Sequence, residues 1–166
     1  MDEQVKAVCT WRFVFTDTKT GEVTKEIVKK NVLTNDAKQI FAQALAQMFG
    51  DQSQGRYNWC IMLGTGTGVP SATDTGLFQP ITSTAKKGDI SYSNNQVTYH
   101  VRYQPNEANG YTFTEAGIYD GIAKWSGFDP TSDYSLGTFI SHLLIDPPAV
   151  KDENNALDIY ATITFV

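Results

Sequence analysis

Apolar and polar side chains alternate with a period of two near both ends of the chain. The odd positions from Val5 to Phe15 are apolar, and so are the odd positions from Leu157 to Phe165. Successive side chains of a β-strand point to opposite faces, so this alternation is typical of a strand with one buried face. A helix would show a period near 3.6 instead. The two stretches predict a chain that folds mainly into β-sheet.

Further strands are predicted between these stretches, bounded by Gly, Pro, Asn and Asp. Val23–Lys30 follows the turn-forming segment Asp17–Gly21 and predicts a hairpin with the first strand. The other predicted strands are Tyr57–Leu63, Leu77–Thr84, Asp89–Tyr103, Tyr111–Tyr119, Leu136–Ile145 and Ala156–Val166. No linker or repeat divides the chain, so the pattern favours one antiparallel β-sandwich or barrel-like domain over residues 1–166.

One amphipathic helix is predicted, at about Asn35–Phe49. Thr34 and Asn35 are suitable N-cap residues, and Gly50 follows the last apolar position as a stop signal. The apolar side chains recur at helical spacing at Ile40, Phe41, Ala44, Leu45, Met48 and Phe49. Such a stripe usually packs on a sheet, and we expect that role rather than a cofactor-binding or membrane face.

The charge balance excludes several classes of partner. The chain has 13 Lys and Arg against 18 Asp and Glu, a formal net charge of −5, whereas proteins that bind DNA or RNA present basic surfaces. No apolar run near the N-terminus is long enough for a signal peptide or a membrane span. The sequence therefore predicts a protein that is made in a cytoplasm and has neither nucleic acid nor membrane as partner.

Cys9 and Cys60 are the only cysteines, and each lies in an apolar, strand-like segment. Buried cysteines often behave as small apolar residues, and a reducing cytoplasm disfavours disulfides. We expect two free thiols.

The segment Gly64–Gly76 begins with alternating Gly and Thr and could suggest a phosphate-binding loop. Such a loop needs glycines that open a helix, and a P-loop also needs a Lys before Ser or Thr. Neither follows here. We expect a surface loop, and no cofactor is predicted.

The histidines and several acids are candidate catalytic or metal-binding groups. His100 and His142 fall on the polar side of predicted strands and are expected to be exposed, and Asp74 lacks the spacing of a calcium loop. Glu115 interrupts an apolar run and is expected to be partly buried, as a structural acid that binds loop amides. No catalytic or metal-binding residue is predicted.

Four segments occur in a defined order along the chain. They are Asn31–Thr34, Tyr57–Leu77 with its Gly-Thr loop, Phe113–Asp120 and Ile140–Phe165. This order resembles a group of small tailed-bacteriophage virion proteins of the tail-fibre or minor structural type. The resemblance implies a virion location and no catalysis. The hairpin of residues 1–30 lies outside it and could serve as an assembly arm.

We therefore expect a non-enzymatic structural protein of a virion, in the tail (fibre, tip or baseplate) or on the capsid surface as a decoration protein. It would pack against other virion proteins and against itself, with a trimer as our guess. Only 19% of its residues are charged, below the typical value of about 25%, which suggests a covered surface. The predicted aromatic interface anchors are Trp11, Trp59, Trp125, Phe128 and Tyr134.

Two alternatives stay open. The first is a glycan- or receptor-binding β-sandwich module, for which the loop around Trp125 offers an aromatic platform. The second is an enzyme on a β-scaffold. That reading requires Glu115, His100 and His142 to converge, and coordinates that hold them far apart would exclude it.

Overall fold

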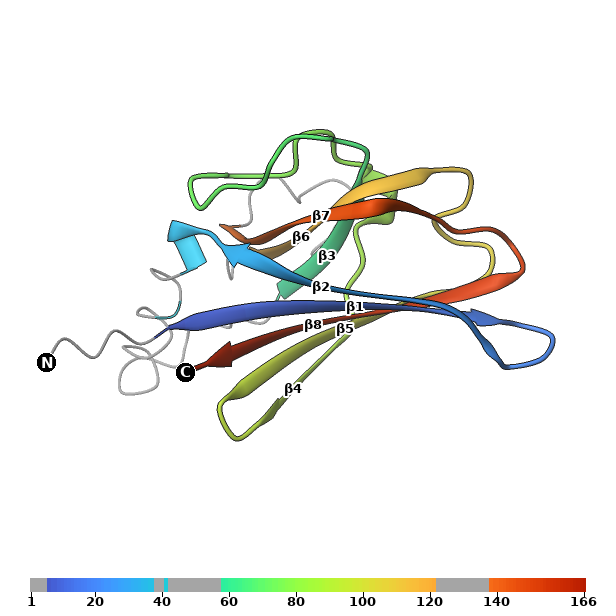
Figure 1. Cartoon of the computed structure of the whole chain (residues 1–166), viewed down its shortest axis with the longest axis horizontal. Coiled ribbons are helices and arrows are strands. Elements are labelled where there is room, and N and C mark those ends of the chain that lie inside the picture. Colours follow the sequence, from blue (N-terminus) through green and yellow to red (C-terminus); the bar gives the residue numbers. More distant parts are fainter. Residues whose placement is uncertain (1–5, 38–40, 42–57, 122–137) are drawn as a thin grey trace, which may run out of the picture.

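The computed structural model describes residues 6–37, 41, 58–121 and 138–166 (Figure 1). The strands are β1 (Ala7–Asp17), β2 (Val23–Leu33), β3 (Asn58–Gly64), β4 (Asp89–Ser93), β5 (Gln96–Tyr103), β6 (Thr112–Gly121), β7 (Thr138–Val150) and β8 (Asn155–Phe165), with a short 3-10 helix, η1 (Thr82–Thr84). All strand pairs are antiparallel. The prediction of a mainly β fold is confirmed.

The strands follow one another in the order β3-β6-β7-β2-β1-β8-β5-β4 and lie in two layers (Figure 1). We call the layer of β2, β1, β8, β5 and β4 sheet A, and the layer of β3, β6 and β7 sheet B. β2 connects them, because most of it pairs with β1 while its last residues, Val32 and Leu33, pair with His142 and Ser141 of β7. Two antiparallel sheets joined in this way are consistent with a β-sandwich.

One hydrophobic core lies between the two sheets. β1 shows how the predicted alternation builds it: Trp11 and Phe13 are buried, while Arg12 between them is exposed. The largest apolar side chains of this core with less than 2% exposure are Trp11, Phe13, Phe113, Ile61, Leu63, Ile118, Ile140 and Ile145. The predicted hairpin is part of this core, because β1 lies between β2 and β8.

Two of the predicted strands are wrong in detail. Asp89–Tyr103 is not one strand but the hairpin β4–β5, whose turn contains Asn94 with a positive φ of 52°. Asn tolerates this conformation better than most residues. Leu77–Thr84 forms no strand, and within it only Pro80 makes an isolated bridge, with Gly64, before η1 begins.

β7 extends beyond its predicted end at Ile145 to Val150, although it contains two prolines. Opposite β6, Leu144 pairs with Glu115 and Ala149 pairs with Phe113, so β7 has extra residues between these two pairs. Pro147 and Pro148 lie in this bulge, where a missing backbone N–H breaks no ladder hydrogen bond.

The predicted helix Asn35–Phe49 lies largely outside the described residues. Within them, Asn35–Ala37 and Phe41 have helical backbone, and Thr34 Oγ1 accepts a hydrogen bond from the Ala37 N–H at 3.2 Å, as an N-cap does. The ring of Phe41 packs edge-on against Phe165 of β8, with 5.3 Å between ring centroids. Only this short helical turn is established, and the rest of the helix stays a prediction.

Candidate functional site

The outer face of sheet B is covered by the segment that follows β3. Figure 1 shows this segment, in green, crossing over β7, β6 and β3 on the side away from sheet A. A second apolar cluster lies under it, made of Cys60, Met62, Leu77, Ala85, Tyr119 and Phe139. Sheet B is therefore buried on both faces, which explains why β3 is an unbroken apolar run.

A histidine between two carboxylates lies on this covered face. His142 Nε2 is 2.9 Å from Glu115 Oε2, and His142 Nδ1 is 2.6 Å from Asp74 Oδ2. The side chain of His142 has no exposed surface, and those of Glu115 and Asp74 are 1% and 12% exposed. The cluster joins β6, β7 and the covering loop, from positions that are distant in sequence.

Glu115 also holds the loop through its backbone. Oε1 accepts hydrogen bonds from the Gly66 and Gln79 amides at 2.9 and 2.7 Å, and Oε2 accepts one from Phe78 at 3.0 Å. Burial alone would raise the pKa of Glu115, but the hydrogen bonds from His142 and the three amides outweigh burial and hold this pKa below its ordinary value. The expectation of a structural acid that binds loop amides is confirmed.

The cluster must contain two shared protons. A carboxylate only accepts hydrogen bonds, and a neutral imidazole donates from one nitrogen only. Either an imidazolium of His142 donates to both acids, or a neutral His142 donates to one acid and accepts from the protonated form of the other. The net charge of the three side chains is −1 in both cases, and the loop amides that point at Glu115 partly offset it.

Asp74 is fixed from its own loop as well. Its Oδ2 accepts a hydrogen bond from the Ser71 amide at 2.8 Å, and its amide donates to the Ser71 carbonyl at 3.1 Å. The ring of Phe78 then covers His142, with 4.7 Å between ring centroids. The loop therefore supplies one acid, three amides and an aromatic cover to two residues of sheet B.

The glycines of the Gly-Thr run make this close approach possible. A Cβ on Gly66 would lie 2.6 Å from Glu115 Oε1 and 2.6 Å from the Cβ of Phe78, and a Cβ on Gly68 would lie 2.4 Å from the Phe78 ring. Real Cβ atoms do not come so close to other atoms. The run is thus a packing motif over a buried carboxylate, and its Gly66 amide binds Glu115.

The arrangement gives little scope for catalysis. Both ring nitrogens of His142 face carboxylates, so neither is free to accept a proton from a nucleophile. Because these nitrogens lie on opposite sides of the ring, Asp74 and Glu115 cannot converge on one ion. The described residues contain no His, Cys, Asp and Glu cluster placed to hold a metal.

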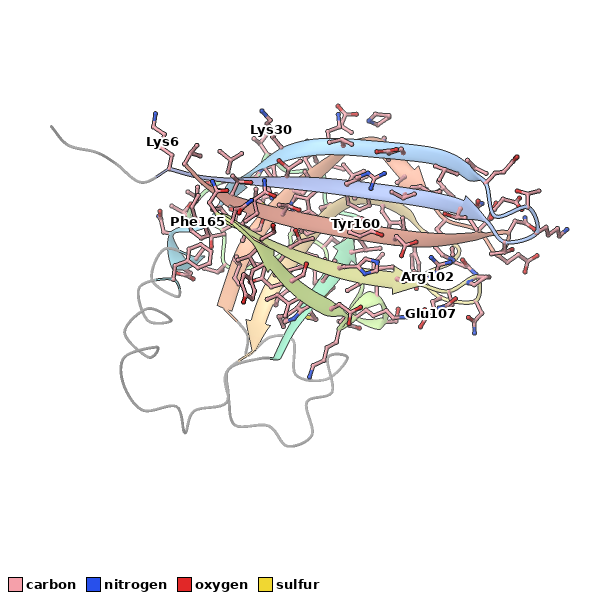
Figure 2. The ribbon with its side chains drawn as sticks, turned by 90° about the horizontal axis from the view of Figure 1, so that it is seen from below. Lys6, Lys30, Arg102, Glu107, Tyr160 and Phe165 are labelled. Atoms are coloured by element: carbon pink, nitrogen blue, oxygen red, sulfur yellow. The ribbon has the colours of Figure 1, made fainter. Side chains whose placement is uncertain are left out.

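His100 lies elsewhere, on the outer face of sheet A. Its Nε2 is 2.8 Å from Asp158 Oδ1, and its ring stacks on Tyr160 with 4.4 Å between centroids. Arg102 Nη1 donates to the other Asp158 oxygen at 2.6 Å; Figure 2 shows Arg102 and Tyr160 on this face. His100 is a cross-strand histidine, as predicted, but with 28% exposure it is half-buried rather than exposed. The prediction is wrong for His142, which is buried.

An enzyme would have been excluded if Glu115, His100 and His142 lay far apart, and this condition is met only in part. His100 is separated by the core from Glu115 and His142, but the latter two are in contact. The sequence analysis missed their contact and the role of Asp74. Its assumption that the polar side of β7 faces solvent was wrong, because the loop covers that side.

Two predicted interface anchors are core residues. Trp11 has no exposed surface, and its Nε1 donates to Ser141 Oγ at 3.3 Å. Trp59 is 6% exposed and packs edge-on against Tyr99, with 4.8 Å between centroids. Side chains buried this deeply have almost no surface left for another subunit, so this expectation is corrected. Trp125, Phe128 and Tyr134 lie outside the described residues.

Both cysteines are free and buried, as predicted. Burial raises the pKa of Cys9 to about 11, against the opposing effect of hydrogen bonds with Ser141 and Trp11. Burial likewise raises the pKa of Cys60 to about 12. Neither thiol is poised as a nucleophile.

None of the helical segments in the described part of the chain is long and apolar enough to cross a membrane. Comparison with known proteins gave no relative: no family model, no curated protein and no solved structure matches the chain.

Proposed function

We propose that the chain is a non-enzymatic structural protein of a bacteriophage particle, which works by packing against copies of itself and other virion proteins. Its place would be the tail (fibre, tip or baseplate) or the capsid surface, and a trimer is the expected assembly. The resemblance in sequence suggests the particle. The observation that carries the assembly role is the open edge of sheet A at β4.

β4 is an edge strand with unusual exposure. It pairs with β5 on one side and with no other strand among the described residues, and all five of its residues are exposed. Ile90 and Tyr92, which point to the same face, are 49% and 87% exposed. An open edge with apolar side chains is a template for another strand.

The other open part of sheet A differs in chemistry. Most of β2 pairs only with β1, yet Lys25 and Lys29 share the face of its buried residue Ile27. Inward-pointing lysines on an edge strand discourage pairing with a second chain. β4 contains no lysine or proline. Among the described residues, sheet A thus carries lysines at one edge and has no strand paired to the other.

The energetics favour a repeated contact over an isolated one. Fully burying an aliphatic side chain contributes roughly 1.5–3 kcal/mol, and Ile90, which is 49% exposed, would contribute less. Association costs at least about 4 kcal/mol in lost rigid-body freedom. Pairing through one short strand therefore gives only weak association between two subunits. It becomes effective when symmetry repeats it or when a particle holds the subunits close together.

Light scattering of the purified protein tests the proposal. We expect the wild-type protein to be an oligomer and the double variant Ile90→Lys, Tyr92→Lys to be a monomer with unchanged circular dichroism. The matched control is Val69→Lys, which places the same charge on another exposed apolar residue (83% exposed) and should leave the oligomer intact.

A wild-type protein that stays monomeric at all concentrations, or a double variant that still assembles, would contradict the role of β4. The particle assignment needs a separate measurement. Quantitative mass spectrometry of purified virions should find the chain in a copy number that matches either tail or capsid symmetry, and its absence from the particle would refute the assignment.

A further inference from the structure

A cavity of about 540 Å³ lies between η1 and the loop that follows β5. Its wall is formed by Ser83, Thr84, Ala85, Lys86, Tyr103, Asn106, Glu107, Ala108, Asn109 and Tyr111. The volume falls within the range of roughly 300–1,000 Å³ that is usual for small-molecule sites. Figure 2 places Glu107 beside the end of β5, below Arg102.

The loop that forms one wall is held in place. Glu107 Oε2 forms an ion pair with Lys86 and accepts a hydrogen bond from the Gln104 amide at 2.6 Å. On the other side of the loop, the buried Lys151 donates to Asn109 Oδ1 at 2.8 Å and to the Pro105 carbonyl at 3.3 Å. The cavity is therefore preformed, and a ligand would not have to order it.

The lining offers polar groups that are not used by the fold. Among the described residues, the side chain of Asn106 and the Oε1 atom of Glu107 have no hydrogen-bond partner. Tyr111 lies beside them with 41% of its surface exposed, and its ring contacts Phe113 at 6.2 Å between centroids. An amide and a carboxylate oxygen next to an exposed aromatic ring combine hydrogen bonding with stacking.

The charges in the cavity decide between ligand classes. Lys86 and Glu107 neutralise each other, so the lining carries no net charge to attract an anion or a cation. A neutral ligand with several hydroxyl groups fits best. Adjacent hydroxyls can donate to the Glu107 carboxylate and accept from the Asn106 amide, while the apolar face of a sugar ring can lie on an aromatic side chain.

We propose that this cavity binds a neutral sugar residue of a glycan, with Tyr111 as the stacking platform and Asn106 and Glu107 as the hydroxyl-binding groups. This site goes beyond the assembly through β4 and does not rest on it. It also differs in place from the loop around Trp125, which the sequence suggested for a glycan.

NMR titration of the isotope-labelled full chain with neutral monosaccharides and neutral oligosaccharides, observed on the protein amides, tests the site. We expect saturable binding of at least one neutral sugar, with amide shifts at Asn106 and Tyr111. Tyr111→Ala should weaken binding roughly tenfold, while Tyr111→Phe, which keeps the ring, should bind nearly as well. Asn106→Ala should also weaken binding, because a bound hydroxyl loses its partner.

Tyr92→Ala is the control, since it removes an exposed tyrosine far from the cavity lining and should not change the affinity. Because Tyr92 belongs to the β4 edge, an unchanged affinity of Tyr92→Ala also shows that sugar binding is independent of the assembly role. The site is refuted if no neutral sugar binds, or if binding survives unchanged in both Tyr111→Ala and Asn106→Ala. Tighter binding of charged sugars than of neutral ones would refute the ligand class.

Discussion

His142 and Glu115 lie on neighbouring strands with 2.9 Å between Nε2 and Oε2, and neither side chain is open to solvent. Their contact turns one face of sheet B into an attachment point for the loop above it.

Glu115→Gln should destabilise the protein by about 3 kcal/mol or more. The variant keeps the shape of the side chain but removes the charge that accepts hydrogen bonds from His142 and three loop amides, and breaking a buried network of this kind costs about 3–5 kcal/mol. Urea denaturation at neutral pH measures the change. Glu26→Gln, in an exposed ion pair with Arg12, should change stability far less, because exposed ion pairs contribute little; equal effects of both variants would contradict the prediction.

The cluster should make the protein sensitive to acid. The pKa of Glu115 is lowered in the folded state from its ordinary value of 4.5, so its contribution to stability is complete above that pH and is lost as the pH falls through the lower folded value. The urea midpoint of the wild-type protein should fall over this window. Glu115→Gln should lose less stability over the same window, and parallel curves for the two proteins would contradict the assignment to Glu115.

Gly66→Ala should destabilise the protein by about 1–3 kcal/mol, as overpacking does. The new methyl group would meet the Cβ of Phe78 and the oxygen of Glu115, and both are held by the hydrogen bonds of the loop. Thermal unfolding checks this. Thr67→Ala changes the next, exposed residue of the loop and should stay within about 0.5 kcal/mol. A stable Gly66→Ala protein would mean that the loop does not pack on Glu115.

Cys9 and Cys60 should resist alkylation in the native protein. Their raised pKa values of about 11 and about 12 leave almost no thiolate at mildly alkaline pH, and both side chains are fully buried. Iodoacetamide followed by mass spectrometry should give no adduct on the native protein and two adducts in guanidinium chloride. Rapid labelling of native Cys60 would show that the cover over sheet B opens readily.

Much of the fold could be read from local pattern. β1 and β8 were found because their buried apolar residues alternate with mostly polar ones, so that a period of two survives in the sequence. β3 was found because both of its faces are buried. The Asn94 turn was missed because a turn without Gly or Pro gives a weak signal. The change of the apolar positions from even, at Ile90 and Tyr92, to odd, at Val97 and Tyr99, marks it in the sequence.

The candidate site could be predicted only in part. Glu115 was noticed because an acid in an apolar run needs partners. His142 and Asp74 were not assigned to it, since their roles depend on the covering loop, and nothing in a period of two tells which polar face will be covered. The close approach at Gly66 is likewise a tertiary property, although the Gly-Thr run marks its position.

The start of β1 and the end of β8 lie side by side, and this determines how the sandwich responds to force. Lys6 and Val166 exchange two backbone hydrogen bonds, of 2.9 and 2.6 Å, next to the pair Ala7 and Phe165 of β1 and β8. Tension between these two residues would peel the strands apart one hydrogen-bonded pair at a time instead of shearing all pairs together. A small force between Lys6 and Val166 would therefore unfold the sandwich. A larger assembly that transmits force through this protein would have to be attached at other residues.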